Sequence, residues 1–250
     1  MKTYLLIFSF LVLTGSCSQE SDPNIAKEED TEVSFRPEKV LFIGNSHTNY
    51  NGGMDTALKG FLDAIELSYS PQVERMALDG YSMEDHASDP NSLAKLQEQD
   101  WDVVILQENS SRAANEILEA KLGIESVSRK IKNDKAKLYL FMTWAYRHQP
   151  GMLNGIRTTH EEIAPLINAK IVPVGLAFKE VQNDTNTTID LYNQDGVHAS
   201  AAGTFLAAAM FYEAIYSMDP TLNSNTAGLD KADADYLKGI AHKVLSEYKK

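Results

Sequence analysis

The chain has 250 residues, 43% hydrophobic and 23% charged, which suits one domain with a full core once an export segment is set aside. Its formal net charge is −12 at pH 7. This acidic balance argues against nucleic acid and anionic membrane surfaces as partners, because phosphate binding requires clustered lysine and arginine.

Residues 1–17 have the layout of an export signal. Lys2 is followed by an apolar run over residues 4–13, which is short for a membrane span, and then by Thr14-Gly15-Ser16-Cys17. Small residues leading into a cysteine resemble a bacterial lipoprotein signal, in which that cysteine is lipidated. Cys17 is the only cysteine, so an internal disulfide and a cysteine-based zinc site are excluded. We expect lipidation at Cys17 and a cell-envelope location held only by this anchor; the alternative is an ordinary signal peptide.

Residues 18–37 are polar and acidic and include Glu28-Glu29-Asp30, which predicts a disordered tether. The folded domain is expected over residues 38–250, with no internal repeat or second linker.

Within this domain, apolar runs of strand length alternate with segments of helical periodicity. The predicted strands cover residues 39–43, 72–77, 103–106, 137–142 and 171–174, and the predicted helices cover 54–67, 92–99, 115–132, 153–167, 201–216 and 232–248. Apolar strands without alternation imply a parallel sheet covered on both faces. We therefore predict a flavodoxin-like α/β fold, a three-layer α/β/α sandwich with a parallel five-stranded sheet.

Polar residues follow three of the predicted strands, where a core would not need them. They are Asn45-Ser46, Asp79-Gly80-Tyr81-Ser82 and Gln107-Glu108-Asn109-Ser110. The carboxyl ends of parallel strands share one edge of the sheet, and ligands bind at that edge in open α/β folds. Ser46 also stands just before a predicted helix, where backbone N–H groups can stabilise negative charge.

Four blocks of this sequence resemble the SGNH branch of the GDSL hydrolases, from about residue 39 to 216. They are Ile43-Gly44-Asn45-Ser46, Gly80, Asn109 within Leu106-Gln107-Glu108-Asn109-Ser110, and Asp195-Gly196-Val197-His198. The resemblance implies the SGNH hydrolase fold and a Ser46–His198–Asp195 catalytic triad. It also implies an oxyanion hole made by the backbone N–H groups of Ser46 and Gly80 and the side-chain amide of Asn109.

The third block departs from the family pattern, because Gln107 and Ser110 replace its usual glycine and aspartate. His47 follows the nucleophile where an apolar residue is more usual.

The Asp195-x-x-His198 spacing allows the two side chains to contact each other in a loop. The carboxylate can then fix the imidazole tautomer and stabilise the imidazolium that forms when His198 takes the serine proton. A serine hydroxyl without such a base is a weak nucleophile.

Other polar and aromatic residues near the sheet edge have less defined roles. His47, Trp144 and Tyr146 are candidate substrate-lining residues, and the two aromatics either stack on a sugar ring or cap the core. His86 is interpreted as holding the Gly80 loop by a hydrogen bond. His148, His160 and His242 occur in polar contexts and are predicted at the surface.

The preferred interpretation is a serine esterase that removes an ester or O-acetyl group from a small molecule or glycan. A carbohydrate substrate follows from the resemblance and the expected envelope location alone. The alternative is a non-catalytic glycan-binding lipoprotein. A flavin binder is disfavoured because the loop at Gly44 is not glycine-rich, and a metallohydrolase because Asp195 and His198 supply too few ligands. We therefore expect no cofactor and no metal.

Overall fold

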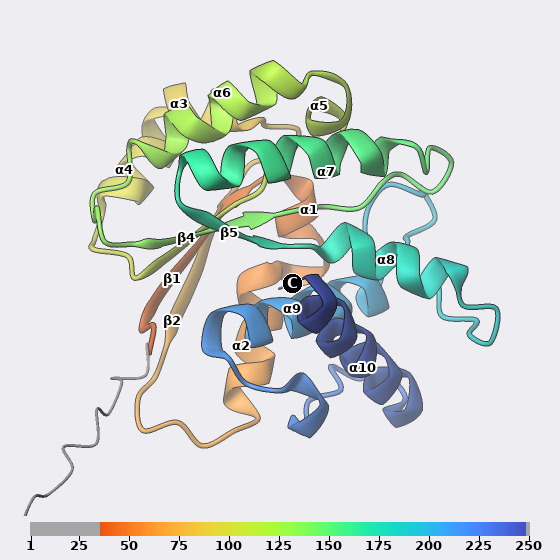
Figure 1. The fold of residues 1–250 in the computed structure, drawn as a ribbon. Coiled ribbons are helices and arrows are strands. Elements are labelled where there is room, and N and C mark those ends of the chain that lie inside the picture. The colour runs from red at the N-terminus through yellow and green to blue at the C-terminus, as the bar shows by residue number, and fades with distance from the viewer. Residues whose placement is uncertain (1–35, 249–250) are drawn as a thin grey trace, which may run out of the picture. The chain divides into compact units, whose positions relative to one another are not determined.

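Five parallel strands form the central sheet of the computed structural model, which describes residues 36–248 (Figure 1). The strands are β1 (Lys39–Gly44), β2 (Gln72–Ala77), β3 (Val103–Leu106), β4 (Lys137–Phe141) and β5 (Ala169–Val172), in the order β2-β1-β3-β4-β5. Every neighbouring pair is parallel. The predicted parallel five-stranded sheet is confirmed. The predicted signal segment, Cys17 and residues 18–35 of the predicted tether lie outside the described residues.

Ten α-helices accompany this sheet within residues 36–248. They are α1 (Ser46–Asn49), α2 (Met54–Asp63), α3 (Met83–Ser88), α4 (Pro90–Gln97), α5 (Ser110–Asn115), α6 (Ile117–Ser128), α7 (Met152–Ile163), α8 (Val174–Asn183), α9 (Ala201–Tyr216) and α10 (Lys231–Tyr248). Short 3-10 turns cover Tyr50–Gly52, Ala164–Leu166 and Pro220–Leu222. None of the described helices is long and apolar enough to cross a bilayer.

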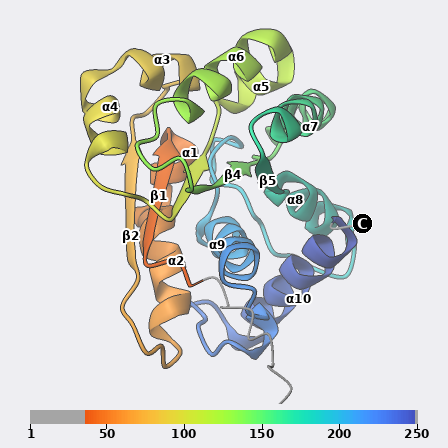
Figure 2. The ribbon, with the colours of Figure 1, turned by 60° about the vertical axis from the view of Figure 1, so that its left-hand side comes forward.

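The helices cover both faces of the sheet and so complete the predicted three layers (Figures 1 and 2). Alternate residues of each strand point to opposite faces. Val40 and Phe42 of β1 pack in a core with α2, α8, α9 and α10. Leu41 and Ile43 pack on the other face with residues of α3, α4, α6 and α7. α9 is apolar on nearly all sides because it lies between the sheet and its neighbouring helices.

Four helices were not predicted from the sequence, and the shortest of them, α1, has only four residues. α3 and α5 each have six residues, too few for a clear apolar period, and their starts are set by side-chain caps at Ser82 and Asn109. α8 begins where the last strand was expected to end. Pro173 stands at its N-cap and has no N–H for a sheet ladder, so β5 ends at Val172.

The prediction that His160 lies at the surface is wrong. Helix α7 turns its side chain to the buried face, on the side of Ile156 and Ile163, and the ring is fully buried. Its Nδ1–H donates to the Ile156 carbonyl at 2.7 Å, which gives the buried ring a polar partner. His148 is exposed and His242 is partly exposed, as expected.

Candidate active site

Ser46 is the first residue of α1 and directly follows Asn45, which ends the turn out of β1. The side chain of Asn45 caps this short helix by accepting a hydrogen bond from the His47 N–H at 3.1 Å. Its amide Nδ2 also donates to the Tyr81 carbonyl at 2.8 Å. Asn45 therefore links the Ser46 turn to the loop that contains Gly80.

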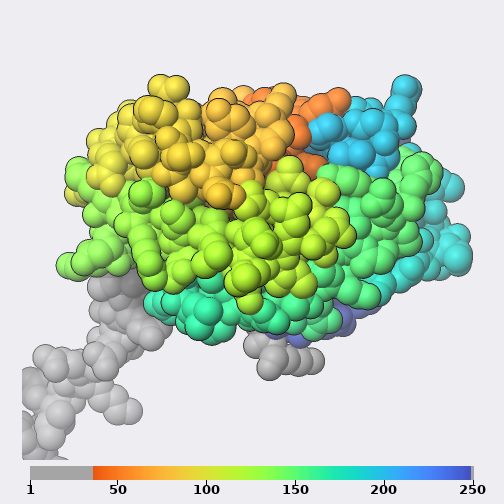
Figure 3. All heavy atoms as spheres, turned by 90° about the horizontal axis from the view of Figure 1, so that it is seen from above, coloured from red at the N-terminus to blue at the C-terminus, as the bar shows by residue number. Residues whose placement is uncertain are grey.

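His198 lies between Ser46 and Asp195. Its Nε2 is 2.8 Å from Ser46 Oγ, and its Nδ1 is 2.6 Å from Asp195 Oδ2. In the space-filling view, the orange segment after β1 and the light-blue segment before α9 lie side by side (Figure 3). The structure thus brings the predicted serine, imidazole and carboxylate into one hydrogen-bonded chain.

The Asp195 carboxylate is held in its charged form. Its Oδ1 accepts from the backbone N–H groups of Val197 and His198 at 2.8 and 2.9 Å. Partial desolvation alone would raise the pKa of Asp195, but the bonds from the His198 ring and these two N–H groups outweigh it and lower the pKa to about 2. Asp195 can therefore act as a fixed negative partner of His198 at any ordinary pH.

Tyr50 supports His198 from one side, a role the sequence did not reveal. The two rings stack with centroids 4.3 Å apart and planes within 9°. The phenol oxygen of Tyr50 accepts from the Asn193 amide at 3.0 Å, and the Asn193 N–H donates to the His198 carbonyl. The only sequence signal is the position of Tyr50 one helical turn after Ser46.

Gly80 and Asn109 lie next to each other, with Asn109 Nδ2 3.5 Å from the Gly80 carbonyl. Gly80 has φ +80, a conformation that L side chains rarely adopt. The Asn109 side-chain oxygen caps α5 by accepting from the N–H groups of Ser111 and Arg112, which fixes the amide nitrogen on the Gly80 side. Capping and donation to an oxyanion are therefore compatible, because they use opposite ends of one amide.

Two of the three candidate substrate-lining residues are buried. Trp144 is 1% exposed, stacks on Phe178 with centroids 4.2 Å apart, and donates from Nε1 to the Val197 carbonyl. It is a core residue under the His198 loop, so it offers a sugar no ring face, and the substrate-lining role is wrong for it. Tyr146 is half-buried and remains able to contact a ligand.

His47 packs among aromatic rings and is 7% exposed. Its ring lies 4.9 Å from Trp144 and 5.5 Å from His198. Burial lowers the pKa of His47 to about 3, and the neighbouring His198 acts in the same direction. His47 is therefore a neutral wall of the site with little surface for a substrate, and it cannot carry a proton near neutral pH.

The departures in the third block have structural roles here. Gln107 Oε1 accepts from the Asn45 N–H and the Thr48 hydroxyl, both at 2.9 Å, so it holds the turn around Ser46. Ser110 is buried against Thr143, 2.8 Å away. His86 holds the end of β1 through Nε2 and the Gly44 carbonyl at 2.8 Å, rather than the Gly80 loop as predicted.

Within residues 36–248, no group of three His, Cys, Asp or Glu side chains lies where it could hold a metal ion. Fold and site together define a three-layer α/β/α protein with a Ser–His–Asp chain at the carboxyl edge of its sheet.

Comparison with solved structures identifies the fold of this chain. No protein-family model and no curated protein matches the sequence. A solved protein of the DUF4886 family from Bacteroides uniformis matches 85% of this chain and 96% of its own, with 20% identity and a TM-score of 0.69. A candidate SGNH hydrolase from Slackia heliotrinireducens matches 71% of this chain and 98% of its own, with 25% identity and a TM-score of 0.60.

A further similar structure is a catalytic mutant of an acetylxylan esterase from Geobacillus stearothermophilus, with 20% identity, a TM-score of 0.55, and 70% and 93% of the two chains covered. The chain has the SGNH hydrolase fold. The resemblance seen in the four sequence blocks is confirmed at the level of this fold.

Proposed function

We propose that the protein is a serine hydrolase that cleaves carboxylic esters, with Ser46 as its nucleophile. The observation that carries this proposal is the unbroken chain from Ser46 Oγ to His198 at 2.8 Å and from His198 to Asp195 at 2.6 Å. Acyl transfer requires a hydroxyl group in contact with a base, and it requires that this base is oriented by a carboxylate. The fold supports the same chemistry, since solved neighbours include esterases.

In the proposed reaction, Ser46 Oγ attacks the ester carbonyl carbon while His198 Nε2 takes the hydroxyl proton. Asp195 remains a carboxylate and stabilises the imidazolium. The tetrahedral oxyanion is stabilised by the N–H groups of Ser46 and Gly80 and the Asn109 amide. Its collapse breaks the bond to the alcohol, which leaves with the proton from His198. Water, activated by the same imidazole, then releases the acid and restores Ser46.

Two amides support this assignment of the oxyanion hole. Among the described residues, neither the Ser46 N–H nor the Gly80 N–H donates a hydrogen bond. Gly80 is also exposed, and a Cβ placed on it would meet no atom within 4 Å. A negatively charged oxygen could therefore accept from both groups without breaking a bond within the protein.

We further propose that the alcohol part of the ester is a carbohydrate. A hollow of about 430 Å³ adjoins Tyr146, which also stacks near His47, with 6.3 Å between the ring centroids. The half-buried Tyr146 ring and several polar side chains line it, a mixture that suits the apolar faces and hydroxyl groups of sugars. The polar side chains are Asn154, Lys179, Gln182 and Asn183. The acetylxylan esterase among the structural neighbours is consistent with this substrate class.

The location of the protein belongs to the same proposal. A lipid on Cys17 would tether the domain to the bacterial cell envelope, where acylated glycans are encountered. Replacing Cys17 by alanine should move the protein from the membrane fraction to the soluble fraction. Retention of the Cys17→Ala protein in membranes would contradict the anchor.

Hydrolysis of p-nitrophenyl acetate by the purified protein tests the esterase. Ser46→Ala should abolish turnover, and Ser246→Ala, which changes an exposed serine on α10, should not alter it. Equal rates for Ser46→Ala and the parent protein would remove Ser46 as the nucleophile. A panel of acetylated sugars then tests the carbohydrate: Asn183→Ala should lower activity on them while leaving p-nitrophenyl acetate turnover unchanged.

A further inference from the structure

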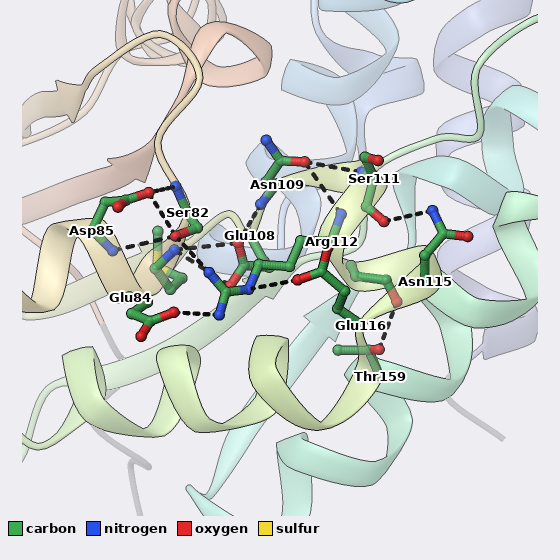
Figure 4. Close-up of polar contacts among 12 residues, drawn as sticks. Ser82, Glu84, Asp85, Glu108, Asn109, Ser111, Arg112, Asn115, Glu116 and Thr159 are labelled. Carbon is green, nitrogen blue, oxygen red and sulfur yellow. Dashed lines mark hydrogen bonds and ion pairs between the residues drawn. The ribbon is translucent and has the colours of Figure 1, made fainter.

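A buried carboxyl group connects the two loops that carry the proposed oxyanion donors. Glu108 follows β3 and is 0% exposed. It accepts from the Asn109 N–H at 2.6 Å and from the Met83 N–H at 3.2 and 3.3 Å to its two oxygens (Figure 4). Asn109 supplies one proposed donor, and Met83 lies just after the Gly80 loop. One side chain therefore fixes the separation of the two loops.

The neighbouring elements hold Glu108 in this position. α6 approaches it closely at Gly123, where a Cβ would lie 3.4 Å from a Glu108 oxygen and 2.9 Å from the Glu84 nitrogen. On the α3 side, Ser82 and Asp85 form a capping box that fixes the direction of the helix. The Met83 N–H is thus directed at the carboxyl group by the helix that follows Gly80.

The charges around Glu108 come from two helices. Arg112 on α5 is the attracting cation, and it binds the Ser82 hydroxyl at 3.1 Å together with Glu84 and Glu116 (Figure 4). Asp85 on α3 is the repelling anion. Burial raises the pKa of Glu108 to about 7, although both N–H groups and Arg112 act in the opposite direction.

A carboxyl group is an unfavourable choice for this position if packing is its only purpose. Burying an ionisable group costs more free energy than burying an amide or an apolar side chain of similar size. Glu108 is closed off from solvent, so it cannot exchange a proton with a bound ester. Its use must therefore lie in what its oxygens hold.

We propose that Glu108 is a positioning residue that keeps the Gly80 and Asn109 donors at the spacing required by the oxyanion, and does so best as a carboxylate. This inference rests on the proposed ester hydrolysis. A protonated Glu108 keeps one good acceptor oxygen, whereas the carboxylate presents two to the Asn109 and Met83 N–H groups. Because the donors act on the transition state, loss of this positioning lowers kcat more than it changes KM.

Two substitutions separate the contributions of shape and charge. Glu108→Gln keeps the shape and one acceptor, and Glu108→Met keeps the approximate volume with no acceptor. On p-nitrophenyl acetate at pH 8, we expect kcat per active site to fall about tenfold for Glu108→Gln and about 100-fold for Glu108→Met, with KM within about twofold. Glu116→Gln, an exposed partner of Arg112, is the matched control and should keep the parent kcat.

Active sites are counted by the stoichiometric reaction of Ser46 with an organophosphonate. A purely structural Glu108 would lower the fraction of titratable sites and leave kcat per site unchanged. If Glu108→Gln has the same kcat per active site as the parent protein at pH 8, the proposal is overturned. This outcome decides the question even if Glu108→Met does not fold.

A second measurement does not depend on catalysis. The backbone amide resonances of Asn109 and Met83 should shift together with one ionisation near neutral pH in the parent protein, and should not shift in Glu108→Gln. If Ser46 is unreactive but these amides titrate, the esterase proposal fails and the Glu108 link between the loops stands. Amides that do not titrate in the parent protein would show that Glu108 does not ionise in this range, which would overturn the assignment of the positioning to its carboxylate form.

Discussion

The side-chain oxygen of Gln107 occupies the space that a side chain on Gly44 would need. A Cβ on Gly44 would lie 2.5 Å from Gln107 Oε1 and 2.4 Å from Thr48 Oγ1. The same Gln107 oxygen accepts from the Asn45 N–H and the Thr48 hydroxyl, on either side of Ser46. Gly44 is therefore required for space, and Gln107 fixes the turn that presents the nucleophile.

Gly44→Ala should destabilise the protein by about 1–3 kcal/mol, because the added methyl group overlaps two buried side-chain oxygens. Adding Gln107→Gly removes one of those oxygens, so the double variant should be more stable than the sum of the two single changes predicts. Urea unfolding of all four proteins measures this coupling.

Gly239→Ala is the matched control for the glycine change. Gly239 lies within α10, and a Cβ there would meet no atom within 4 Å. We expect this variant to be stabilised by roughly 0.5–1 kcal/mol, since alanine favours the helix. Strictly additive effects of Gly44→Ala and Gln107→Gly would show that these positions do not compete for space.

Asn109 should have two separable roles, because opposite ends of its amide face α5 and Gly80. Asn109→Asp keeps the capping oxygen but loses the donor, and Asn109→Ala loses both. Both variants should reduce kcat by at least about 100-fold. Only Asn109→Ala should lose about 1 kcal/mol of stability from the missing cap.

Stability of the Asn109 variants is best compared at pH 5.5, where Glu108, with a pKa of about 7, carries its proton and does not repel a new aspartate. Ester hydrolysis is measured separately at pH 8. If Asn109→Asp kept the parent kcat, Asn109 would be a helix cap and the oxyanion would need another donor.

Asp195→Asn should reduce kcat by roughly three to four orders of magnitude, because an amide cannot stabilise the imidazolium of His198 as a carboxylate does. The lowered pKa of Asp195, about 2, gives the sign of its pH dependence. Its contribution to stability is present above pH 4 and is lost only as the pH falls through about 2. Loss of activity between pH 7 and 5 therefore does not come from Asp195.

The rate of p-nitrophenyl acetate hydrolysis from pH 5 to 8 checks this assignment. Because Asp195 keeps its charge over this range, Asp195→Asn should lower the rate at every pH from 5 to 8. Asp134→Asn, an exposed change in the loop before β4, should reproduce the parent profile. An Asp195→Asn enzyme with the parent kcat would exclude Asp195 from the reaction.

The features that could be predicted are set by short stretches of the sequence. The features that could not be predicted depend on contacts between segments far apart in the chain. The sheet could be predicted because its strands are unbroken apolar runs, and the Asp195–His198 contact because both residues lie in one short loop. The stacking of Tyr50 on His198 joins segments far apart in the chain. The burial of Glu108 likewise depends on how α3 and α6 pack, and its sequence position after a strand predicts only a polar turn.

The ionisation of Glu108 should affect activity and stability in opposite directions. Its carboxylate form favours catalysis, whereas its protonated form favours the folded state. Its pKa is raised from 4.5 to about 7 by burial, so the folded protein holds a proton that the unfolded chain releases. Its contribution to stability is therefore full below about pH 4.5 and is lost as the pH rises to about 7. At about 1.4 kcal/mol per pKa unit, this loss is roughly 3.5 kcal/mol at most.

Glu108→Gln removes this titration while leaving the other ionisable groups in place. Urea unfolding at pH 4.5 and 8 should show that the stability of the variant relative to the parent rises with pH by up to this amount. Its activity should fall over the same range relative to the parent. A constant stability difference between the two proteins would mean that Glu108 titrates alike in the folded and unfolded chains. Burial would then not control its charge.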